Sequence, residues 1–574
     1  MDKLYPVYTL KNECHDCYKC VRECYMKAIK IEDGHASIMP EKCIACGKCV
    51  TACPAGAKKV RDDTEKVKNL IRAQKRIYVS LAPSWRGVFD ISAKKLIGLL
   101  KNLGFEGVSE TALGAQEVSI ATAKTLKEGK PGLHISSACP VIVDYVRYYM
   151  SDYTDSITPL ASPALTHAKM LKETFGNDIA IVFIGPCIAK KNESDKNPEL
   201  IDVALTFDEL LRWINDEGIN LEDIPTGEDE AFVPESAYEG ALYPIEGGMN
   251  ETIKKCGIPD DVQLLSVSSL NAFKAAIEGL NISNIKKPIF VEALACDGGC
   301  IAGPSISSKK ARISIMSTIM TKLKTRDEVP KNPQVIVKED YQAKPVSKQT
   351  YPITEILKAL KKIGKHSVED ELNCGGCGYN TCRELAQALI SGEAESSMCV
   401  SYMRKIAMRK AAAMLRCMPS AIVMVDNDLK IVEANDAFMK MFCGEMYEIF
   451  ANRQDGVVGA AIDRLVPFSD IFKSALKTGK DIHKERYPVN NKLFDITAFT
   501  IEPNQIVGTV ITDVTQTEMR RDQISKKAQK VIAKNIAIVQ DIACMLGEHM
   551  VDTELLLSSI ADDFDSDNDK GDQK

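Results

Sequence analysis

Residues 287–300, KPIFVEALACDGGC, run from an apolar stretch into a loop of small residues that carries two cysteines. Three other stretches have the same form: KRIYVSLAPSW at 75–85, LHISSACP at 133–140 and IAIVFIGPC at 179–187. Each is an apolar, β-rich run that ends in a small or proline-containing loop, and helical stretches lie between them. This alternation predicts an α/β domain over residues 70–327.

The cysteines of these loops are expected to lie together. In an open parallel sheet, ligand sites collect just beyond the carboxyl ends of the strands. Four thiols from three loops would then converge, enough to hold one 4Fe-4S cubane: Cys139, Cys187, Cys296 and Cys300. Buried structural cysteines are the alternative, since free cysteine often lies in cores. The glycines and prolines beside these thiols favour the metal site.

Composition limits the class of protein. The chain has 574 residues, which predicts several domains, and 26% charged residues with 45% hydrophobic ones are ordinary globular values. A net charge of −6 argues against nucleic acid as the main partner. The apolar runs are too short to span a membrane, and the N-terminus shows no export signal, so we expect a cytoplasmic protein. Twenty cysteines in a reducing compartment indicate metal ligation or redox chemistry rather than disulfides.

Residues 1–62 contain two runs of the spacing C-x2-C-x2-C-x3-C, which is typical of a two-cluster bacterial ferredoxin domain. Three thiolates two residues apart wrap one face of a cubane, and the fourth crosses to the other cluster. We therefore predict one 4Fe-4S cluster on Cys14, Cys17, Cys20 and Cys53, and a second on Cys43, Cys46, Cys49 and Cys24. Zinc is the alternative, but zinc ribbons use paired C-x2-C knuckles.

Three segments, SSACP, GPCIAKKNE and EALACDGGCIAG, resemble the signature segments of FeFe hydrogenases, and the resemblance covers residues 1 to about 330. In that family four cysteines hold a 4Fe-4S cubane, and one of them bridges to a diiron unit with CO, cyanide and azadithiolate ligands. The resemblance implies that Cys139, Cys187 and Cys296 are cubane ligands and that Cys300 is the bridge.

The resemblance also implies roles for residues around the diiron unit. Lys190 occupies the position that contacts a cyanide, for which an ammonium is a suitable partner in a dry cavity. Glu193 can pair with this lysine and hold it in place, whereas Lys191 is expected to be a solvated neighbour. Pro83 and Ser84 match the loop that lines the pocket and contacts the second cyanide.

Several positions depart from the family pattern. Ala138 replaces the cysteine that passes protons to the bridging amine, and Glu117 is the only acid left in the segment that usually carries the relay carboxylates. Ser162 keeps the family's serine position, and Gly185 replaces the methionine before Pro186. Because general acid transfer is worth about 10²- to 10⁴-fold in rate, we expect slow or biased hydrogen chemistry.

A polar linker is predicted at residues 328–352, followed by a small domain at 353–411. The small domain contains the spacing C-x2-C-x4-C-x16-C, which resembles the 4Fe-4S domain of corrinoid and acetyl-CoA-pathway proteins. Its predicted ligands are Cys374, Cys377, Cys382 and Cys399. Zinc remains an open alternative at this site.

Residues 412–515 have two β-like runs around the turn DND, a helix starting near Asn435, and a closing strand that ends in Asp513-Val514-Thr515. This arrangement resembles a PAS domain, and a generic α+β dimerisation module is the alternative.

Residues 516–561 are predicted to form one helix with a heptad seam and to give a parallel homodimer. The seam positions are Ile524, Ala528, Val531, Asn535, Ile538, Ile542 and Met545. A helix folded back on the PAS domain is the other possibility. The tail, 562–574, is expected to be disordered.

Together these features favour a sensory FeFe hydrogenase that slowly and reversibly oxidises H2 to protons and electrons. Accessory 4Fe-4S clusters would relay the electrons, and the PAS domain would signal to an effector in trans, a kinase or phosphatase. The expected partners also include ferredoxin or a similar carrier and the hydrogenase maturation proteins. Two alternatives remain open: a catalytic hydrogenase that evolves H2 from reduced ferredoxin, and an iron-sulfur carrier that lacks the diiron centre.

Overall fold

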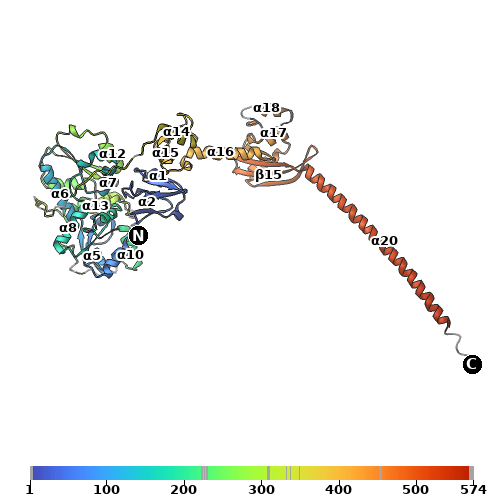
Figure 1. Ribbon diagram of the computed structural model, residues 1–574, viewed down its shortest axis with the longest axis horizontal. Coiled ribbons are helices and arrows are strands. Elements are labelled where there is room, and N and C mark those ends of the chain that lie inside the picture. The colour runs from blue at the N-terminus through green and yellow to red at the C-terminus, as the bar shows by residue number, and fades with distance from the viewer. Residues whose placement is uncertain are drawn as a thin grey trace, which may run out of the picture. The chain divides into compact units, whose positions relative to one another are not determined.

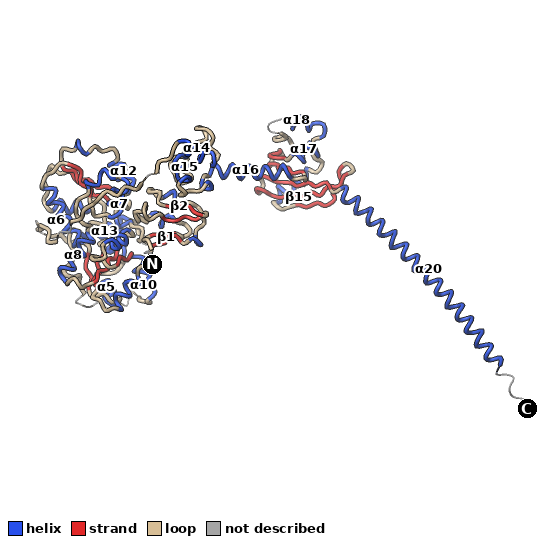
Figure 2. Tube along the Cα trace, in the orientation of Figure 1, coloured by secondary structure: helices blue, strands red, loops and turns tan. Residues whose placement is uncertain are grey.

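The computed structural model describes residues 4–567, apart from 221–223, 225–226, 228–229, 307–309, 327, 331, 336–337, 348 and 452–455. The chain divides into two compact units, residues 1–403 and residues 404–574, which are described separately. Figure 1 labels the elements of both units, and Figure 2 shows their secondary structure. The mixed α/β and α+β fold class that the sequence predicts is confirmed.

The first sixty residues fold into two similar halves around a pair of short helices. The helices are α1 (Lys19–Glu23) and α2 (Lys48–Ala52). Two antiparallel strand pairs flank them: β1 (Val7–Thr9) with β4 (Lys58–Val60), and β2 (Ile29–Glu32) with β3 (His35–Ile38). Each helix is preceded by a residue in the left-handed region, Tyr18 before α1 and Gly47 before α2. The cysteine loops therefore turn sharply just before each helix.

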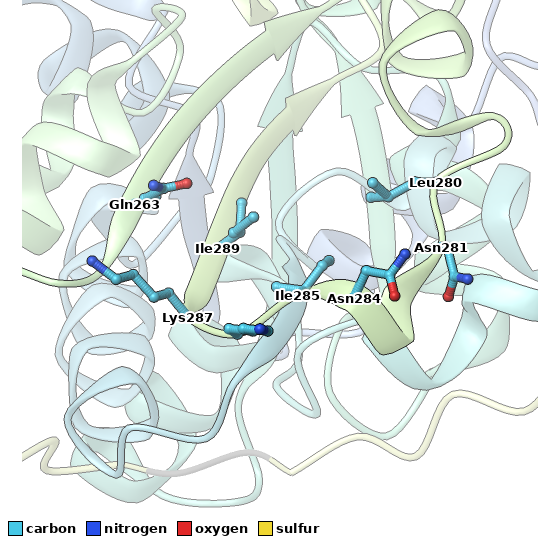
Figure 3. A pocket seen from close by; sticks show the side chains of 8 residues that line it. Gln263, Leu280, Asn281, Asn284, Ile285, Lys287 and Ile289 are labelled. Atoms are coloured by element: carbon cyan, nitrogen blue, oxygen red, sulfur yellow. The ribbon is translucent and has the colours of Figure 1, made fainter.

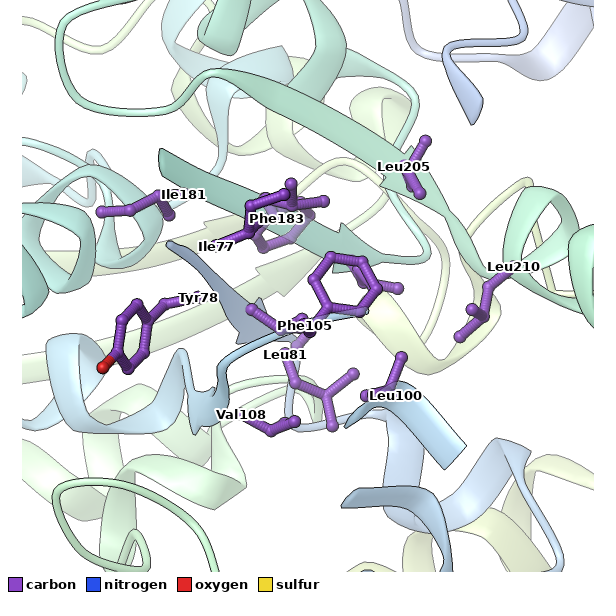
Figure 4. Packing of buried hydrophobic residues seen from close by; sticks show 14 of the residues in the cluster. Ile77, Tyr78, Leu81, Leu100, Phe105, Val108, Ile181, Phe183, Leu205 and Leu210 are labelled. Atoms are coloured by element: carbon purple, nitrogen blue, oxygen red, sulfur yellow. The ribbon is translucent and has the colours of Figure 1, made fainter. Parts of the chain in front are cut away.

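Two parallel sheets form the centre of the α/β domain. One has the order β6-β5-β8-β9 and the other β10-β11-β7. The strands are β5 (Ile77–Leu81), β6 (Gly107–Glu110), β7 (Gly132–Ile135), β8 (Ala180–Gly185), β9 (Val203–Thr206), β10 (Gln263–Ser268) and β11 (Pro288–Leu294). The four apolar runs of the sequence are thus strands β5, β7, β8 and β11. Figure 4 shows the buried side chains that pack around β5 and β8.

Helices cover these sheets, and several begin directly after a strand. They are α3 (Thr64–Arg72), α4 (Trp85–Val88), α5 (Ala93–Asn102), α6 (Ala112–Lys127), α7 (Pro140–Tyr149), α8 (Pro163–Phe175), α9 (Ala189–Lys196), α10 (Phe207–Asp216), α11 (Gly248–Lys255), α12 (Leu270–Ile277) and α13 (Arg312–Thr321). Proline at the first position of α7 and α8 has a backbone angle that suits a helix start.

Part of the predicted linker lies along the α/β domain. The strap, residues 338–346, is held by backbone hydrogen bonds from Lys344 N to Arg147 O (3.0 Å) and from Val346 N to Tyr148 O (3.0 Å). The hydroxyl of Tyr341 donates to Leu160 O at 2.9 Å. The polar composition predicted a linker here, and several of its backbone groups have hydrogen-bond partners on the α/β domain.

The small domain contains α14 (Ile353–Lys362) and α15 (Cys382–Ile390), and α16 (Val400–Cys417) follows it. It packs against the N-terminal module, with which it shares one hydrophobic core that includes Val21, Ile31, Leu360 and Leu385. The backbone also joins the two, because Ile31 N donates to Glu393 O at 2.9 Å.

The second unit contains a five-stranded antiparallel sheet of order β13-β12-β16-β15-β14. Its strands are β12 (Ala421–Asp426), β13 (Ile431–Ala434), β14 (Ile482–Val489), β15 (Lys492–Glu502) and β16 (Ile506–Asp513). Its helices are α17 (Asp436–Phe442), α18 (Tyr447–Ala451), α19 (Ser469–Thr478) and α20 (Thr515–Asp567). Asn435 caps α17, as the sequence predicts.

A single helix, α20, follows the sheet and continues beyond the predicted coiled coil. It ends at Asp567, so its backbone extends into the tail that we expected to be disordered, and residues 568–574 lie outside the described part of the chain. At its start, the Thr515 hydroxyl donates to Asp513 Oδ1 at 2.6 Å, and Thr515 Oγ1 accepts from Leu493 N at 2.9 Å. These bonds join the last strand to the helix.

The expectation that Lys191 is solvated is wrong. The Lys191 side chain is 0% exposed, and its ammonium donates to Asp63 Oδ2 (2.9 Å), Glu209 Oε1 (2.8 Å) and Ala204 O (2.9 Å). Asp63 also accepts from Arg61 Nε at 3.0 Å. These buried ions connect the segment that follows β4 with α9 and α10. Two carboxylates thus balance the charge of the buried ammonium, as a buried charge requires.

Replacing Lys191 by methionine should destabilise the α/β domain by about 3–5 kcal/mol, because Asp63 and Glu209 would lose their buried cation. Both tryptophans of the chain, Trp85 and Trp213, lie in this domain's core. Denaturant unfolding followed by tryptophan fluorescence therefore measures the loss. Lys196, also on α9, pairs with Asp144 of α7 and is 44% exposed, so Lys196→Met should cost about 1 kcal/mol or less. Equal effects of the two substitutions would contradict this interpretation.

Candidate metal centre

Four thiols meet where strands β7, β8 and β11 end. Cys139 caps α7 directly after the β7 loop, Cys187 follows the end of β8, and Cys296 and Cys300 lie in the loop after β11. Burial raises the pKa of Cys300, and the neighbouring thiols of Cys139 and Cys187 raise it further. Burial, followed by the neighbouring thiol of Cys139, raises the pKa of Cys187 to about 11. The structure thus brings the four predicted residues together.

A buried ammonium lies beside these thiols. The Lys190 side chain of α9 is 9% exposed, and its Nζ donates to Glu193 Oε2 at 2.6 Å and to Ser162 Oγ at 2.8 Å. Its positive charge lowers the pKa of Cys139, Cys187 and Cys300, against the larger effect of burial. Glu193 thus pairs with Lys190, as the sequence suggests, and Ser162 adds a second partner.

The loop after β5 contributes a polar atom without a partner. Ser84 is buried, and its Oγ has no hydrogen-bond partner among the described residues. Pro83 precedes it in the same loop, and Pro186 lies between the end of β8 and Cys187. Because a buried hydroxyl without a partner is costly, Ser84 is suited to contact a bound group.

The residues present fit an iron-sulfur centre with an anionic ligand sphere. Buried thiols with raised pKa values are poor anions on their own, but metal coordination deprotonates them and compensates the charge. Cys139, Cys187, Cys296 and Cys300 would hold such a group. Lys190 and the unpartnered Ser84 hydroxyl would face its other ligands.

Glu117 and Ala138 occupy positions where we expected an altered proton relay. The Glu117 carboxylate Oε2 accepts from the backbone N–H of Gln334 at 2.6 Å, and burial raises the pKa of this carboxyl group. Glu117 therefore holds the segment that precedes the strap. Ala138 packs against the apolar cluster that contains Tyr243 and Met249.

Sequence reasoning missed one buried acid, Glu292 in β11. Burial raises its pKa to about 7, although its carboxylate accepts from the backbone N–H groups of Met249 (3.3 Å) and Asn250 (3.0 Å). The signal was a single glutamate inside the apolar run KPIFVEALA, where a charge is expected only with dedicated partners.

The ferredoxin-type cysteines separate into the two predicted groups. Burial raises the pKa of Cys20, and the thiols of Cys14, Cys53 and Cys17 raise it further. In the other group, burial raises the pKa of Cys49, and the neighbouring thiols Cys46, Cys43 and Cys24 add to this. Each set of four is therefore mutually close, including the thiol that crosses over from the other run.

The second of these groups lies next to the four-cysteine centre of the α/β domain. A Cβ atom at Gly47 would lie 2.7 Å from Ile188 Cδ1 and 2.7 Å from Pro304 Cγ, so only glycine permits this close approach. The thiol of Cys46 is near enough to raise the pKa of Cys296, after burial and the thiols within the centre. The two groups of thiols are therefore adjacent.

The small domain contains a fourth group of thiols. Four cysteines line one cavity: Cys374, Cys377, Cys382 and Cys399. Arg22, which lies between the third and fourth cysteines of the first run, donates to Cys17 O at 3.0 Å and to Gly376 O at 3.5 Å. The guanidinium thus connects a loop of the N-terminal module with the loop of this cavity.

Figure 3 shows a further hollow of the α/β domain. It is lined by Gln263 at the start of β10, Ile289 near the start of β11, and residues of the segment between them: Leu280, Asn281, Asn284, Ile285, Lys286 and Lys287. The thiols follow the opposite, carboxyl ends of the strands, so we assign no role in the metal chemistry to this hollow.

Comparison with family models agrees with this division of the chain. Residues 75–304 match the iron-only hydrogenase large subunit, C-terminal domain, and residues 6–68 match the 4Fe-4S dicluster domain. Residues 370–401 match an Fe-S cluster model, and residues 409–480 match the PAS domain. The chain thus has a hydrogenase large-subunit domain, a dicluster ferredoxin domain and a PAS domain. The chain is thus similar to FeFe hydrogenases over residues 75–304 and carries a PAS domain in a later segment.

Three curated relatives are similar to parts of the chain. Iron hydrogenase 1 of Clostridium pasteurianum is 23% identical over 349 residues, 49% of this chain and 61% of that protein. The periplasmic Fe hydrogenase large subunit of Nitratidesulfovibrio vulgaris is 25% identical, over 38% of this chain and 63% of its own length. The cytosolic Fe-S cluster assembly factor narfl of Xenopus tropicalis is 28% identical over 188 residues, which are 28% of this chain and 40% of that protein. The chain thus spans about three fifths or less of each relative.

Among solved structures, a variant of the FeFe-hydrogenase HydA1 from Chlamydomonas reinhardtii aligns with a TM-score of 0.39 and 18% identity. The alignment covers 49% of this chain and 99% of that one. Among the described helices, none combines the length and apolar character that crossing a bilayer requires.

Changing one thiol of the small domain should remove one cluster. Cys382→Ser is expected to lower the iron content by about four atoms per chain, because three thiolates hold a cubane poorly. Iron and sulfide analysis of the anaerobically purified protein measures this. Cys256→Ser is the matched control, because the Cys256 thiol donates to Thr252 O and lies outside the four groups. Unchanged iron with loss of zinc in Cys382→Ser would contradict the iron-sulfur assignment.

Proposed function

We propose that this protein is a sensory FeFe hydrogenase that oxidises H2 slowly and reversibly to two protons and two electrons. The observation that carries the proposal is the Lys190 ammonium beside part-buried thiols that meet where strands β7, β8 and β11 end. Cys139, Cys187 and Cys296 would hold a 4Fe-4S cubane, and Cys300 would bridge it to a diiron unit. When bound, this cofactor supplies the centre at which H2 is split or formed.

The chain's own residues would position the cofactor. Glu193 and Ser162 fix the direction of Lys190, whose ammonium would face an anionic ligand of the cofactor. The Ser84 hydroxyl would be available to a second ligand. Ala138 presents a methyl group, which cannot relay a proton, and Glu117 is committed to a backbone contact. Proton transfer is therefore expected to limit the rate.

Electron transfer and signalling use the remaining modules. Electrons would leave toward the cluster of Cys43, Cys46 and Cys49, and from there reach a ferredoxin-type carrier or the small domain's cluster. The predicted seam of α20 supports a homodimer, because its apolar side chains are exposed rather than folded against the sheet: Ile524, Val531, Ile538, Ile542 and Met545. The effector, a kinase or phosphatase, would act in trans, and maturation proteins would install the diiron unit.

The experiment that tests this function adds H2 to the oxidised holoprotein and follows cluster reduction by electron paramagnetic resonance and dye-linked turnover in both directions. We expect H2-dependent reduction of all clusters with turnover well below that of metabolic hydrogenases. Rapid H2 evolution would instead support a ferredoxin-dependent catalytic hydrogenase. Protein that is reduced by dithionite but never by H2 would support an iron-sulfur carrier, the alternative that the similarity to narfl favours.

Restoring the relay thiol should accelerate turnover. Ala138→Cys is expected to raise H2 turnover at least about tenfold, part of the 10²- to 10⁴-fold that general acid transfer contributes. Dye-linked assays of the matured protein measure this. Ala138→Val is the control, because it adds similar bulk without a thiol. Equal rates for the Cys and Val variants would mean that protons travel by another route.

A further inference from the structure

The small domain places a buried lysine in the wall of its four-cysteine cavity. Lys365 is 4% exposed and lines the cavity together with Cys374, Cys377, Cys382 and Cys399. Helix α14 ends just before it, where Gly364 adopts a left-handed φ of 69° and Lys365 N donates back to Leu360 O at 3.0 Å. A side chain at Gly364 would be strained, so this turn aims Lys365 inward.

The ammonium of Lys365 lacks an anionic partner in the described part of the chain. Its Nζ donates to Ser401 Oγ at 3.0 Å, and no described carboxylate forms an ion pair with it. Ser401 Oγ in turn lies 3.4 Å from Cys399 Sγ. Burying an uncompensated ammonium is costly, so a negative charge is expected within the cavity. Four deprotonated cysteines around a metal centre supply that charge.

We propose that Lys365 is the counter-cation of this cluster and that Ser401 passes the cluster's charge state to helix α16. The inference rests on the proposed iron-sulfur occupancy of the small domain but not on the diiron centre. A cluster held by these four thiolates would gain one negative charge if it accepted one electron from a cluster of the N-terminal module. The nearby ammonium stabilises this reduced form more than the oxidised form, so it raises the reduction potential.

The position of Ser401 connects this charge to the second unit through the chain itself. Cys399 directly precedes α16, and Ser401 is the second residue of that helix. At the other end of α16, the Asn435 amide donates to Leu415 O at 3.2 Å and to Ser420 O at 2.9 Å. The Asn435 carbonyl accepts from Ile422 N and Phe438 N, both at 2.9 Å. Hydrogen bonds therefore hold both ends of α16. The first turn is held through Ser401 at the four-cysteine cavity, and the last turn is held through Asn435 of the PAS domain.

The test measures the reduction potential of this cluster in the full-length holoprotein, by a redox titration followed with electron paramagnetic resonance. The signal is identified by its absence in Cys382→Ser. Lys365→Met should shift the reduction potential to more negative values. Lys365→Arg keeps the positive charge, so its potential should stay close to that of the native protein. Lys362→Met, which removes an exposed lysine at the end of α14, is the matched control and should leave the potential unchanged.

The link to α16 is tested by hydrogen exchange of the same protein in its oxidised and reduced states. We expect a redox-dependent change in the first turns of α16, which Ser401→Ala should abolish while the cluster remains.

An unchanged potential in Lys365→Met, or zinc in the site, would overturn the proposal. Loss of the cluster in both Lys365→Met and Lys365→Arg would also overturn it, since the role would then be packing. Loss in Lys365→Met alone would support it. These readouts need no H2, so they are independent of the hydrogenase test.

Discussion

The compensation of buried charge is the constraint on which this structure depends. A thiolate-ligated cluster carries negative charge into the protein interior, and each cysteine group has a buried lysine beside it. Lys190 lies at the hydrogenase-type centre and Lys365 at the small domain's cavity. Lys58, which donates to Thr9 Oγ1 at 2.6 Å, lowers the pKa of Cys20 and Cys49 in the N-terminal module, against the effect of burial. The lysines thus mark the positions where anionic groups are expected.

The same physics holds the modules of the first unit together. The buried ions around Lys191 tie the exit of the ferredoxin-type module to the α/β domain, and Arg22 joins that module to the small domain. Rigid placement matters because electron transfer depends on short distances between cofactors. The strap adds backbone hydrogen bonds across the α/β domain. The hydrogenase-type centre and the accessory cysteine groups therefore belong to one compact unit.

Local spacing was sufficient to predict three of the cysteine groups, because the distance between ligands along a loop limits which thiols reach one cubane. The fourth group, on three separate loops, needed the strand-end rule. The strand-end rule was sufficient for the α/β domain, because parallel strands place their carboxyl ends at a common edge. The sequence could not distinguish the environments of Lys190 and Lys191. Neighbouring residues of a helix point about 100° apart, and the partners of Lys191 lie 128 and 18 residues away in the chain. Lys365 was missed for a related reason, since its burial depends on the turn at Gly364.

The proposed function requires a diiron unit with CO and cyanide ligands beside the four thiols and the Lys190 ammonium. Infrared spectroscopy of the full-length protein, matured with the hydrogenase assembly proteins, detects these ligands. We expect carbonyl and cyanide stretching bands that are present in the native protein and lost in Cys300→Ser. A matured protein with a full complement of cubanes but without these bands would contradict the proposed function.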